Sequence, residues 1–231
     1  MTILSEIGSN HNSDLEIAKR CIRESARCGA DVAKFQLHGT LQPEWIPELI
    51  KECEDCGIKF MASVFNEDSL QYVSNKWYGI KIASPEAANK EFVWKVIERG
   101  QEVGIPVFIS DGGMDSLDEF VSDKVIPFHC VSKYPAQPEE YSFNLYKGKT
   151  WGLSDHTMLT SFPMLAVCAG ATYVEKHFTL DKTQEGDDHH FALEPDEFRD
   201  MVKSITLAEQ IMGGEKITLP EDRVITWPQS Q

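Results

Sequence analysis

The sequence has no long apolar run. Across 231 residues, no stretch approaches the roughly 20 consecutive apolar residues that a membrane-spanning helix needs. Residues 1–6 also lack the basic start and the long apolar stretch of a secretory signal peptide. We therefore expect a cytoplasmic protein with no membrane partner.

Positive charge is scarce. The chain has 22 lysine and arginine residues against 37 aspartate and glutamate residues, which gives a formal net charge of -15 at pH 7. A chain of this charge repels polyanions, so nucleic acid is not an expected partner. If the ligand is a small anion, the cations that hold it must be concentrated locally.

A disulfide framework and a glycine-rich phosphate turn are both missing. The six cysteines are scattered through predicted helices and strands, and Cys53 and Cys56, which have the spacing of half a redox or zinc motif, have no matching second pair. We interpret them as structural. Residues 8–12 follow the first predicted strand but do not fit G-x-G-x-x-G, which disfavours an open, doubly wound sheet that binds a dinucleotide.

The apolar pattern instead predicts eight successive β-then-α units. Six strands are expected at residues 3–7, 31–36, 59–65, 79–84, 106–110 and 125–131, and two more end at His156 and His177. Helices are expected over residues 14–28, 44–56, 68–74, 89–103, 116–121, 158–170 and 195–212, with only a weak helical pattern over 138–145. The chain is therefore predicted to be a compact single-domain (β/α)8 TIM barrel over residues 1–214, followed by a C-terminal tail over 215–231.

Charged residues interrupt these strands. Parallel barrel strands are buried on both faces, so a charge within one is costly unless it is paired or functional. Four occur within strands or at strand ends: Glu6, Lys34, Lys81 and Glu175. Because side chains alternate between faces, Lys34 shares a face with Gln36, and Glu175 shares one with His177. A self-satisfied network of buried ion pairs is the alternative, but polar residues at so many strand ends favour a site at the carboxyl mouth of the barrel.

Two histidines end the last two strands. A right-handed strand, helix, strand unit places the carboxyl ends of both strands at the same end of the sheet, so His156 and His177 should emerge together. Two converging imidazoles are candidate ligands for one divalent metal ion. For either histidine alone, a hydrogen-bonded role without a ligand remains the alternative.

The polar residue types suggest a chemistry. The two lysines and four strand-end serines suit an anion that carries phosphate and carboxylate, and those serines are Ser63, Ser84, Ser132 and Ser154. A metal ion on two histidines would polarise a carbonyl group. Glu6, Glu86 and Asp188 suit sugar hydroxyls, metal-bound water or proton transfer. Together these features suggest that a phosphorylated small acid is joined to an aldehyde.

Several motifs resemble one known family. They are Glu6-Ile7-Gly8-Ser9-Asn10-His11-Asn12, Lys34-Phe35-Gln36, Ile80-Lys81-Ile82-Ala83-Ser84, Gly152-Leu153-Ser154-Asp155-His156-Thr157, Glu175-Lys176-His177-Phe178-Thr179 and Leu193-Glu194-Pro195-Asp196-Glu197-Phe198. In this order, from residue 3 to about residue 214, the chain resembles the sialic acid synthase family, which includes N-acetylneuraminate, legionaminate and pseudaminate synthases and related spore-coat polysaccharide enzymes.

The resemblance implies a metal-dependent condensation of phosphoenolpyruvate with the open-chain aldehyde of an N-acetylmannosamine-like amino sugar, giving a nonulosonate and phosphate. It assigns phosphoenolpyruvate to Lys34, Ser63, Lys81, Ser84, Ser132 and Ser154, and the sugar to Glu6, Gln36, Tyr134 and Asp188. His156 and His177 would bind the divalent ion, which is usually Mn2+, with Mg2+ or Co2+ as alternatives. Glu86 would assist proton transfer or water attack beside the metal, with Lys34 and Lys81 as further catalytic residues.

The sequence also departs from the family pattern. We expect the chain to lack the family's C-terminal antifreeze-like domain, whose arginine reaches a partner subunit's sugar site in the family homodimer. The connection over residues 37–43 is short, and Asp111 adds a carboxylate where the family has Ser-Thr-Gly-Met. Asp111 would weaken anion binding unless it turns outward or is paired.

Other interpretations remain open. The barrel could serve another metal-dependent aldolase or lyase, or a non-catalytic protein that binds a metal ion and phosphoenolpyruvate. Within Gly186-Asp187-Asp188-His189-His190 we interpret His189 and His190 as solvated, because adjacent loop residues seldom all face one ion. Four tryptophans are interpreted as packing between helices and barrel: Trp45, Trp77, Trp94 and Trp151.

Overall fold

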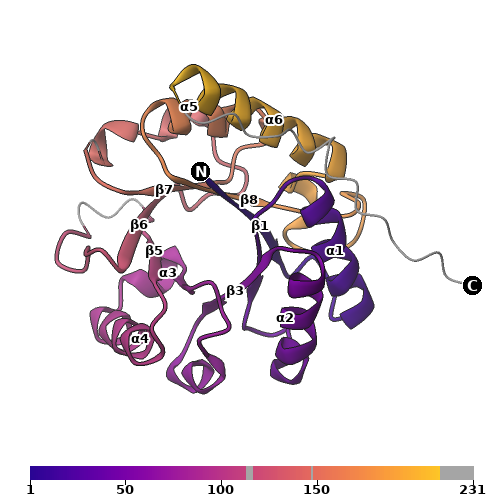
Figure 1. The fold of residues 1–231 in the computed structure, drawn as a ribbon, viewed down its shortest axis with the longest axis vertical. Coiled ribbons are helices and arrows are strands. Elements are labelled where there is room, and N and C mark those ends of the chain that lie inside the picture. Colours follow the sequence, from indigo (N-terminus) through magenta and orange to yellow (C-terminus); the bar gives the residue numbers. More distant parts are fainter. Residues whose placement is uncertain (113–116, 147, 214–231) are drawn as a thin grey trace, which may run out of the picture.

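Eight parallel strands form a closed barrel in chain order, from β1 to β8, and the longer helices lie around it (Figure 1). The structure is a computed structural model that describes residues 1–112, 117–146 and 148–213. The strands are β1 (Thr2–Gly8), β2 (Val32–Gln36), β3 (Lys59–Val64), β4 (Ile80–Ile82), β5 (Val107–Ser110), β6 (Val125–Cys130), β7 (Gly152–Asp155) and β8 (Tyr173–His177). The predicted (β/α)8 fold is confirmed, while the predicted tail over 215–231 lies outside the described residues.

Among the described residues, six α-helices and several short 3-10 turns connect the strands or follow the last one. The helices are α1 (Leu15–Arg27), α2 (Ile46–Asp55), α3 (Ser84–Ala87), α4 (Lys90–Val103), α5 (Phe162–Cys168) and α6 (Pro195–Ile211). The 3-10 turns are η1 (Pro43–Trp45), η2 (Glu67–Tyr72), η3 (Pro138–Glu140), η4 (Phe143–Tyr146) and η5 (His189–Phe191). Helix α1 begins where the Asp14 side chain accepts hydrogen bonds from the backbone N–H groups of Glu16 and Ile17, and α4 ends at Gly104 in the left-handed conformation. No helix in the described part of the chain is long and apolar enough to cross a membrane.

Two predicted helices differ from the structure. Helix α5 begins at Phe162 rather than near residue 158, because Pro163 has no N–H to donate and fits only in the first helical turn. Between β5 and β6, residues 118–120 form a turn rather than the predicted helix, and residue 116 lies outside the described residues. Trp94 was expected to be packed, but it is 45% exposed on α4, where its ring meets the edge of Phe120.

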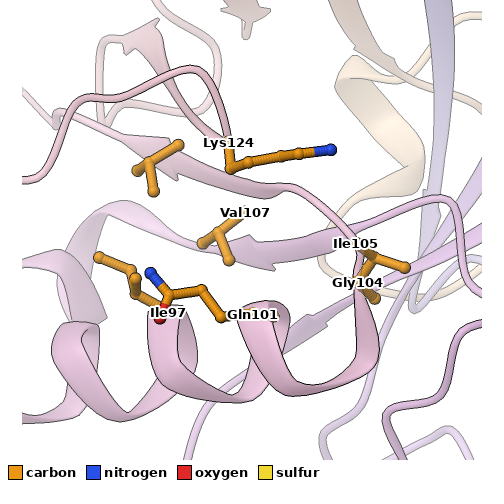
Figure 2. A pocket seen from close by; sticks show the side chains of 8 residues that line it. Ile97, Gln101, Gly104, Ile105, Val107 and Lys124 are labelled. Atoms are coloured by element: carbon orange, nitrogen blue, oxygen red, sulfur yellow. The ribbon is translucent and has the colours of Figure 1, made fainter.

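An apolar cleft lies between α4 and the starts of β5 and β6 (Figure 2). It has a volume of about 210 Å3 and is lined by Ile97, Gly100, Gln101, Gly104, Ile105, Val107, Lys124 and Val125. Val107 and Val125 are the first residues of their strands, so the cleft lies at the amino-terminal end of the barrel. Catalytic groups of such barrels are built at the opposite end, so this cleft is not the candidate site.

The barrel interior is apolar at one level and polar at the next. One buried cluster inside the barrel consists of Leu4, Val32, Met61, Phe108, Ile126 and Phe128. Residues two positions later along a strand point to the same face, so Leu4 is followed by Glu6, Val32 by Lys34 and Met61 by Ser63. The apolar layer therefore closes the barrel beneath a polar layer at the carboxyl ends of the strands.

Candidate active site

Two lysines and two glutamates form the floor of this polar layer. The Lys34 Nζ lies 2.6 Å from Glu6 Oε2 and 3.7 Å from Glu175 Oε2, while the Lys81 Nζ lies 3.8 Å from Glu175 Oε2. All four side chains are buried. The pairing of the barrel strands brings them together, because Glu6 lies beside Lys34 across β1 and β2, and beside His177 across β1 and β8.

Burial and mutual attraction compete in setting the pKa values of the floor. Burial raises the pKa of Glu6 to about 7, against the attraction of Lys34, and burial lowers the pKa of Lys81. Burial alone would also raise the pKa of Glu175, but the attractions of Lys34 and Lys81 and the hydrogen bond from Ser154 lower it on balance. The carboxylate of Glu175 therefore stays ionised between the two lysines.

Hydroxyl groups surround the lysines on β3 to β6. The Lys34 Nζ donates to Ser63 Oγ at 2.9 Å, and the Lys81 Nζ donates to Ser110 Oγ at 2.6 Å. Ser84 and Ser132 share a hydrogen bond of 2.7 Å between their hydroxyl oxygens. Two cations among several hydroxyl donors form the type of site that phosphate and carboxylate oxygens require.

Gly112 lies directly against this serine pair. Its φ of +58° is in the left-handed region, and a Cβ built on it would lie 2.6 Å from the Ser84 Cβ and 3.3 Å from the Ser132 Oγ. A side chain at this position would both strain the backbone and displace the serines. Gly112 therefore allows the close packing of the serine pair.

The two predicted histidines converge at the ends of β7 and β8. Their ring centroids are 5.7 Å apart, and burial lowers the pKa of His156 to about 4 and that of His177 well below its ordinary value. Both imidazoles are therefore neutral near pH 7, and neutral imidazole is the form that binds metal ions.

In each imidazole, one ring nitrogen receives no hydrogen bond from a neighbouring group. His156 donates from Nδ1 to the Val131 carbonyl oxygen at 2.7 Å, which leaves the lone pair on Nε2. Ser154 lies 3.4 Å from that Nε2 and has a 2.9 Å hydrogen bond to Glu175 Oε1, to which it donates its hydrogen. His177 Nδ1 is buried without a hydrogen-bond partner. Neutral imidazole nitrogens of this kind are common ligands of divalent metal ions.

The histidines do not form a complete coordination shell by themselves. Within residues 1–112, 117–146 and 148–213, no group of three or more His, Cys, Asp or Glu side chains is arranged to hold a metal ion. Catalytic metal sites keep positions open for water or substrate, and structural sites are closed by protein ligands. The pair therefore fits an open site better than a structural one.

Carboxylates border the histidine side of the cavity. A Cβ built on Gly8 would lie 3.1 Å from Glu6 Oε1, 3.2 Å from Gln36 Nε2 and 3.3 Å from Asp188 Oδ2, so these three groups surround one small space. Asp188 Oδ2 also lies 3.7 Å from His177 Nδ1, and burial raises the pKa of Asp188. These groups can receive the hydroxyl groups of a sugar.

Tyr134 forms a wall beside the histidines. Its ring centroid lies 4.2 Å from that of His156 and 5.3 Å from that of Phe191.

Glu86 lies on α3 rather than on a strand, and burial raises the pKa of its carboxyl group. The charges of His38 and Lys81 oppose this shift.

Asp111 does not oppose an anion in the cavity. Its carboxylate is fully buried and accepts hydrogen bonds from Tyr146 Oη at 2.6 Å, from the His129 Nδ1 at 2.9 Å and from the Cys130 backbone N–H at 2.9 Å. It is also absent from the cavity lining. Of the two conditions under which Asp111 would not weaken anion binding, the structure shows the second, because the carboxylate is paired.

A buried ion pair outside the cavity contacts the residues on either side of His156. Lys176 Nζ lies 2.6 Å from Asp155 Oδ2 and donates to the carbonyl oxygen of Thr157, the residue that follows His156 in the chain.

His189 was expected to be solvated, but this was wrong. It is buried, with Thr179 Oγ1 at 2.7 Å from its Nδ1 and Asn12 Oδ1 at 3.1 Å from its Nε2, and it connects the loop bearing Asp188 to the barrel.

Most of the predicted site residues line a single cavity of about 40 Å3 at the carboxyl ends of the strands. These are Glu6, Lys34, Gln36, Ser63, Lys81, Ser84, Tyr134, Ser154, His156 and His177. Three predicted residues are not among the lining residues: Ser132 has a hydrogen bond with Ser84, Asp188 lies 3.7 Å from His177, and Glu86 is linked to the site only by the electrostatic effect of Lys81. Ser110 and Cys130 also line the cavity but were given no role from the sequence. Their position as the last residues of β5 and β6 could have identified them as residues of the site.

Known proteins share both this sequence and this fold. A model of the NeuB family matches residues 37–217. An uncharacterized protein of Methanocaldococcus jannaschii is 34% identical over 96% of this chain and 75% of its own length. The N-acetylneuraminate-9-phosphate synthase of Homo sapiens is 31% identical over 91% of this chain and 71% of its own length.

Among solved structures, an N-acetylneuraminic acid (sialic acid) synthetase from Leptospira borgpetersenii, in complex with citrate, has the same architecture. Its TM-score is 0.80 at 26% identity, and the match covers 94% of this chain and 86% of that chain. The sequence and the barrel therefore point to the same set of relatives.

Proposed function

Because the chain belongs to the NeuB family, we propose that it is a synthase that condenses phosphoenolpyruvate with the aldehyde of an N-acylated amino sugar. The products would be a sialic-acid-like 2-keto-3-deoxy sugar acid and inorganic phosphate. One observation carries the proposal. A single cavity brings together two lysines, several serine hydroxyl groups, buried carboxylates and two neutral histidines.

Phosphoenolpyruvate would bind on the lysine and serine side. Its phosphate and carboxylate need several donors, and Lys34, Lys81, Ser63, Ser84, Ser132 and Ser154 supply them. Charge-assisted hydrogen bonds of this kind each contribute about 1.5–3 kcal/mol. In the free protein the lysine charges are balanced by Glu6 and Glu175, so the bound anion would exchange partners with this network rather than meet unpaired cations.

His156 and His177 would hold the divalent ion, for which Mn2+ is proposed, with Mg2+ or Co2+ as alternatives. When bound, such an ion polarises the carbonyl oxygen of the acceptor aldehyde. The hydrogen bond from His156 Nδ1 to Val131 fixes the tautomer that leaves Nε2 available, as supporting partners do in other metal sites.

The sugar would lie on the carboxylate side, against Glu6, Gln36, Asp188 and the ring of Tyr134. Glu6 and Asp188 accept hydrogen bonds from hydroxyl groups, while Gln36 Nε2 already donates to Glu6 Oε1 at 3.0 Å and holds that carboxylate in place. The exposed ring of Tyr134 would cover the acceptor and reduce the access of bulk water to it.

The reaction balances with one water molecule. C3 of phosphoenolpyruvate forms a bond to the aldehyde carbon, whose oxygen takes a proton, and water adds to C2. The bond between C2 and the phosphate oxygen then breaks, which releases phosphate and leaves the 2-keto group. Glu86, whose pKa is raised by burial, is proposed to exchange a proton with the aldehyde oxygen or with the attacking water. Lys34 and Lys81 would hold the phosphate and carboxylate groups of phosphoenolpyruvate so that C3 is oriented toward the aldehyde.

Phosphate release tests this function against its alternatives. The purified protein would be incubated with phosphoenolpyruvate, Mn2+ and a panel of N-acetylated amino sugars and simple aldoses, omitting one component at a time. The proposal predicts release only when all three are present, and no release across the panel would count against it. Pyruvate formed from a sugar acid without phosphate chemistry would identify an aldolase or lyase. Tight calorimetric binding of Mn2+ and phosphoenolpyruvate without turnover would identify a non-catalytic binding protein.

A further inference from the structure

His156 lies just beyond the regular pairing of its strand. β7 pairs with β6 as far as Ser154 and Cys130, and with β8 as far as Asp155 and Lys176. His156 follows Asp155 and is buried. A buried N–H or carbonyl group left without a partner is costly, so the main chain of His156 needs partners from outside the barrel strands.

The segment that follows β6 supplies these partners. The hydroxyl oxygen of Tyr141 accepts a hydrogen bond from the His156 N–H at 3.0 Å and donates to the Ser154 carbonyl oxygen at 3.3 Å. The Ala136 N–H donates to the His156 carbonyl oxygen at 2.9 Å, and His156 Nδ1 donates to the Val131 carbonyl oxygen at 2.7 Å. This segment thus binds every polar group of His156 except Nε2, the nitrogen that is proposed to bind the metal ion.

Tyr141 is itself held by its surroundings. Its ring packs against Phe162 of α5 with the centroids 5.0 Å apart, and it stands perpendicular to the His129 ring at 5.5 Å. The N–H of the next residue, Ser142, donates to His129 Nε2 at 3.1 Å, while His129 Nδ1 donates to the buried Asp111 carboxylate at 2.9 Å. The hydroxyl group of Tyr141 is therefore fixed by contacts made outside the cavity.

We propose that Tyr141 is a positioning residue, whose hydroxyl group fixes the backbone of His156 and so holds its imidazole beside that of His177. The inference rests on the proposed function, because it takes the two histidines as the metal ligands. Among the described residues, Tyr141 is not one that lines the cavity, so it acts through His156 rather than on a substrate. Neither the strand pattern nor the family motifs pointed to it, because it lies in the connection between β6 and β7.

Tyr141→Phe tests this role through the loss of one oxygen atom. The variant keeps the ring that packs against Phe162, but the His156 N–H loses its acceptor and the Ser154 carbonyl oxygen loses its donor. We expect the dissociation constant for Mn2+, measured by electron paramagnetic resonance, to rise roughly tenfold, as it does when groups that orient metal ligands are removed. Activity at low Mn2+ should fall and should recover at saturating Mn2+, which a general loss of folding would not allow.

Tyr146→Phe is the matched control. Tyr146 lies on η4 in the same connection and also loses one hydroxyl group, whose hydrogen bond goes to the buried Asp111 carboxylate at 2.6 Å. That carboxylate keeps its hydrogen bonds from His129 and from the Cys130 N–H. Tyr146→Phe should therefore bind Mn2+ as the unchanged protein does. Equal increases in the dissociation constant for the two variants would reduce Tyr141 to a general stabiliser of the fold and overturn the inference.

Amide hydrogen exchange separates this inference from the proposed function, because it requires no metal ion. In NMR spectra of the metal-free protein, the His156 amide should exchange at least about tenfold faster in Tyr141→Phe than in the unchanged protein, and at its usual rate in Tyr146→Phe. If the protein releases no phosphate and binds no Mn2+, the proposed function fails, but faster exchange in Tyr141→Phe alone still supports the positioning of His156. An unchanged exchange rate in Tyr141→Phe would overturn the inference whether or not Mn2+ binds.

Discussion

His156 and His177 converge from adjacent strands with their ring centroids 5.7 Å apart, and each has a ring nitrogen that receives no hydrogen bond. A buried nitrogen atom without a partner is costly, so the unpartnered Nδ1 of His177 beside this cavity indicates a missing ligand. A divalent ion shared by the two imidazoles would satisfy both nitrogens. This relationship links the barrel to its proposed chemistry.

Removing either imidazole should abolish specific Mn2+ binding. His156→Ala and His177→Ala each leave one ligand, and calorimetry or electron paramagnetic resonance would measure the loss, with circular dichroism showing that the fold persists. His190→Ala, at an exposed histidine outside the cavity lining, is the control and should bind Mn2+ as the unchanged protein does. Full Mn2+ affinity in both cavity variants would remove the histidines from the metal assignment.

Lys81→Met should weaken phosphoenolpyruvate binding. The substitution keeps much of the side-chain volume and removes one charge-assisted contact, so the expected loss is about 1.5–3 kcal/mol, or roughly 10–100-fold in affinity. Calorimetry with phosphoenolpyruvate gives the affinity, and Lys90→Met, at an exposed residue of α4, serves as the control. Unchanged affinity in Lys81→Met would assign this lysine to a structural pair with Glu175.

Gly112→Ala should impair phosphoenolpyruvate binding through the serine pair. The added methyl group would lie 2.6 Å from the Ser84 Cβ, so Ser84 and Ser132 must move, and KM for phosphoenolpyruvate should rise several-fold. Gly104→Ala is the matched control, because its φ of +77° imposes a similar backbone cost of about 1 kcal/mol but nothing lies within 4 Å of the new methyl group. If both variants have the same KM, the close packing at Gly112 does not position the serines.

The stability of the fold should decrease as the pH falls from about 7 to 4. Burial lowers the pKa of His11 to about 4 from its ordinary 6.5, so in this window the unfolded chain binds a proton that the folded chain does not. The free energy of unfolding therefore falls with decreasing pH, by at most about 3 kcal/mol from this residue. Denaturant titrations of the unchanged protein and His11→Gln would measure it. The variant should show a shallower pH dependence, and equal slopes would contradict the assignment.

Much of the fold and of the site followed from the pattern of residue types. The apolar strands predicted the barrel, and the charges within them, such as Lys34 and Lys81, were conspicuous because burying them is costly. Side-chain alternation then placed these lysines in the interior together with His177, and the structure brings all three to one cavity. The sequence therefore predicted which residues face inward.

Contacts between distant segments were harder to predict. Asp111 looked like a threat to anion binding, since nothing in the sequence showed that Tyr146 and His129 would reach it. His189 looked solvated in a polar loop, although Thr179 and Asn12 enclose it. Alternation along a strand is a local rule, whereas these partners depend on how the loops pack, which the local pattern does not encode.

The formation of a carbon-carbon bond is the most direct test of the proposed function. Phosphoenolpyruvate labelled with carbon-13 at C3 would be incubated with Mn2+, N-acetylmannosamine and the protein, and the products followed by mass spectrometry and carbon NMR. The account predicts one product that contains the labelled carbon bonded to the former aldehyde carbon, together with one equivalent of phosphate. Labelled pyruvate and phosphate with the sugar unchanged would contradict it.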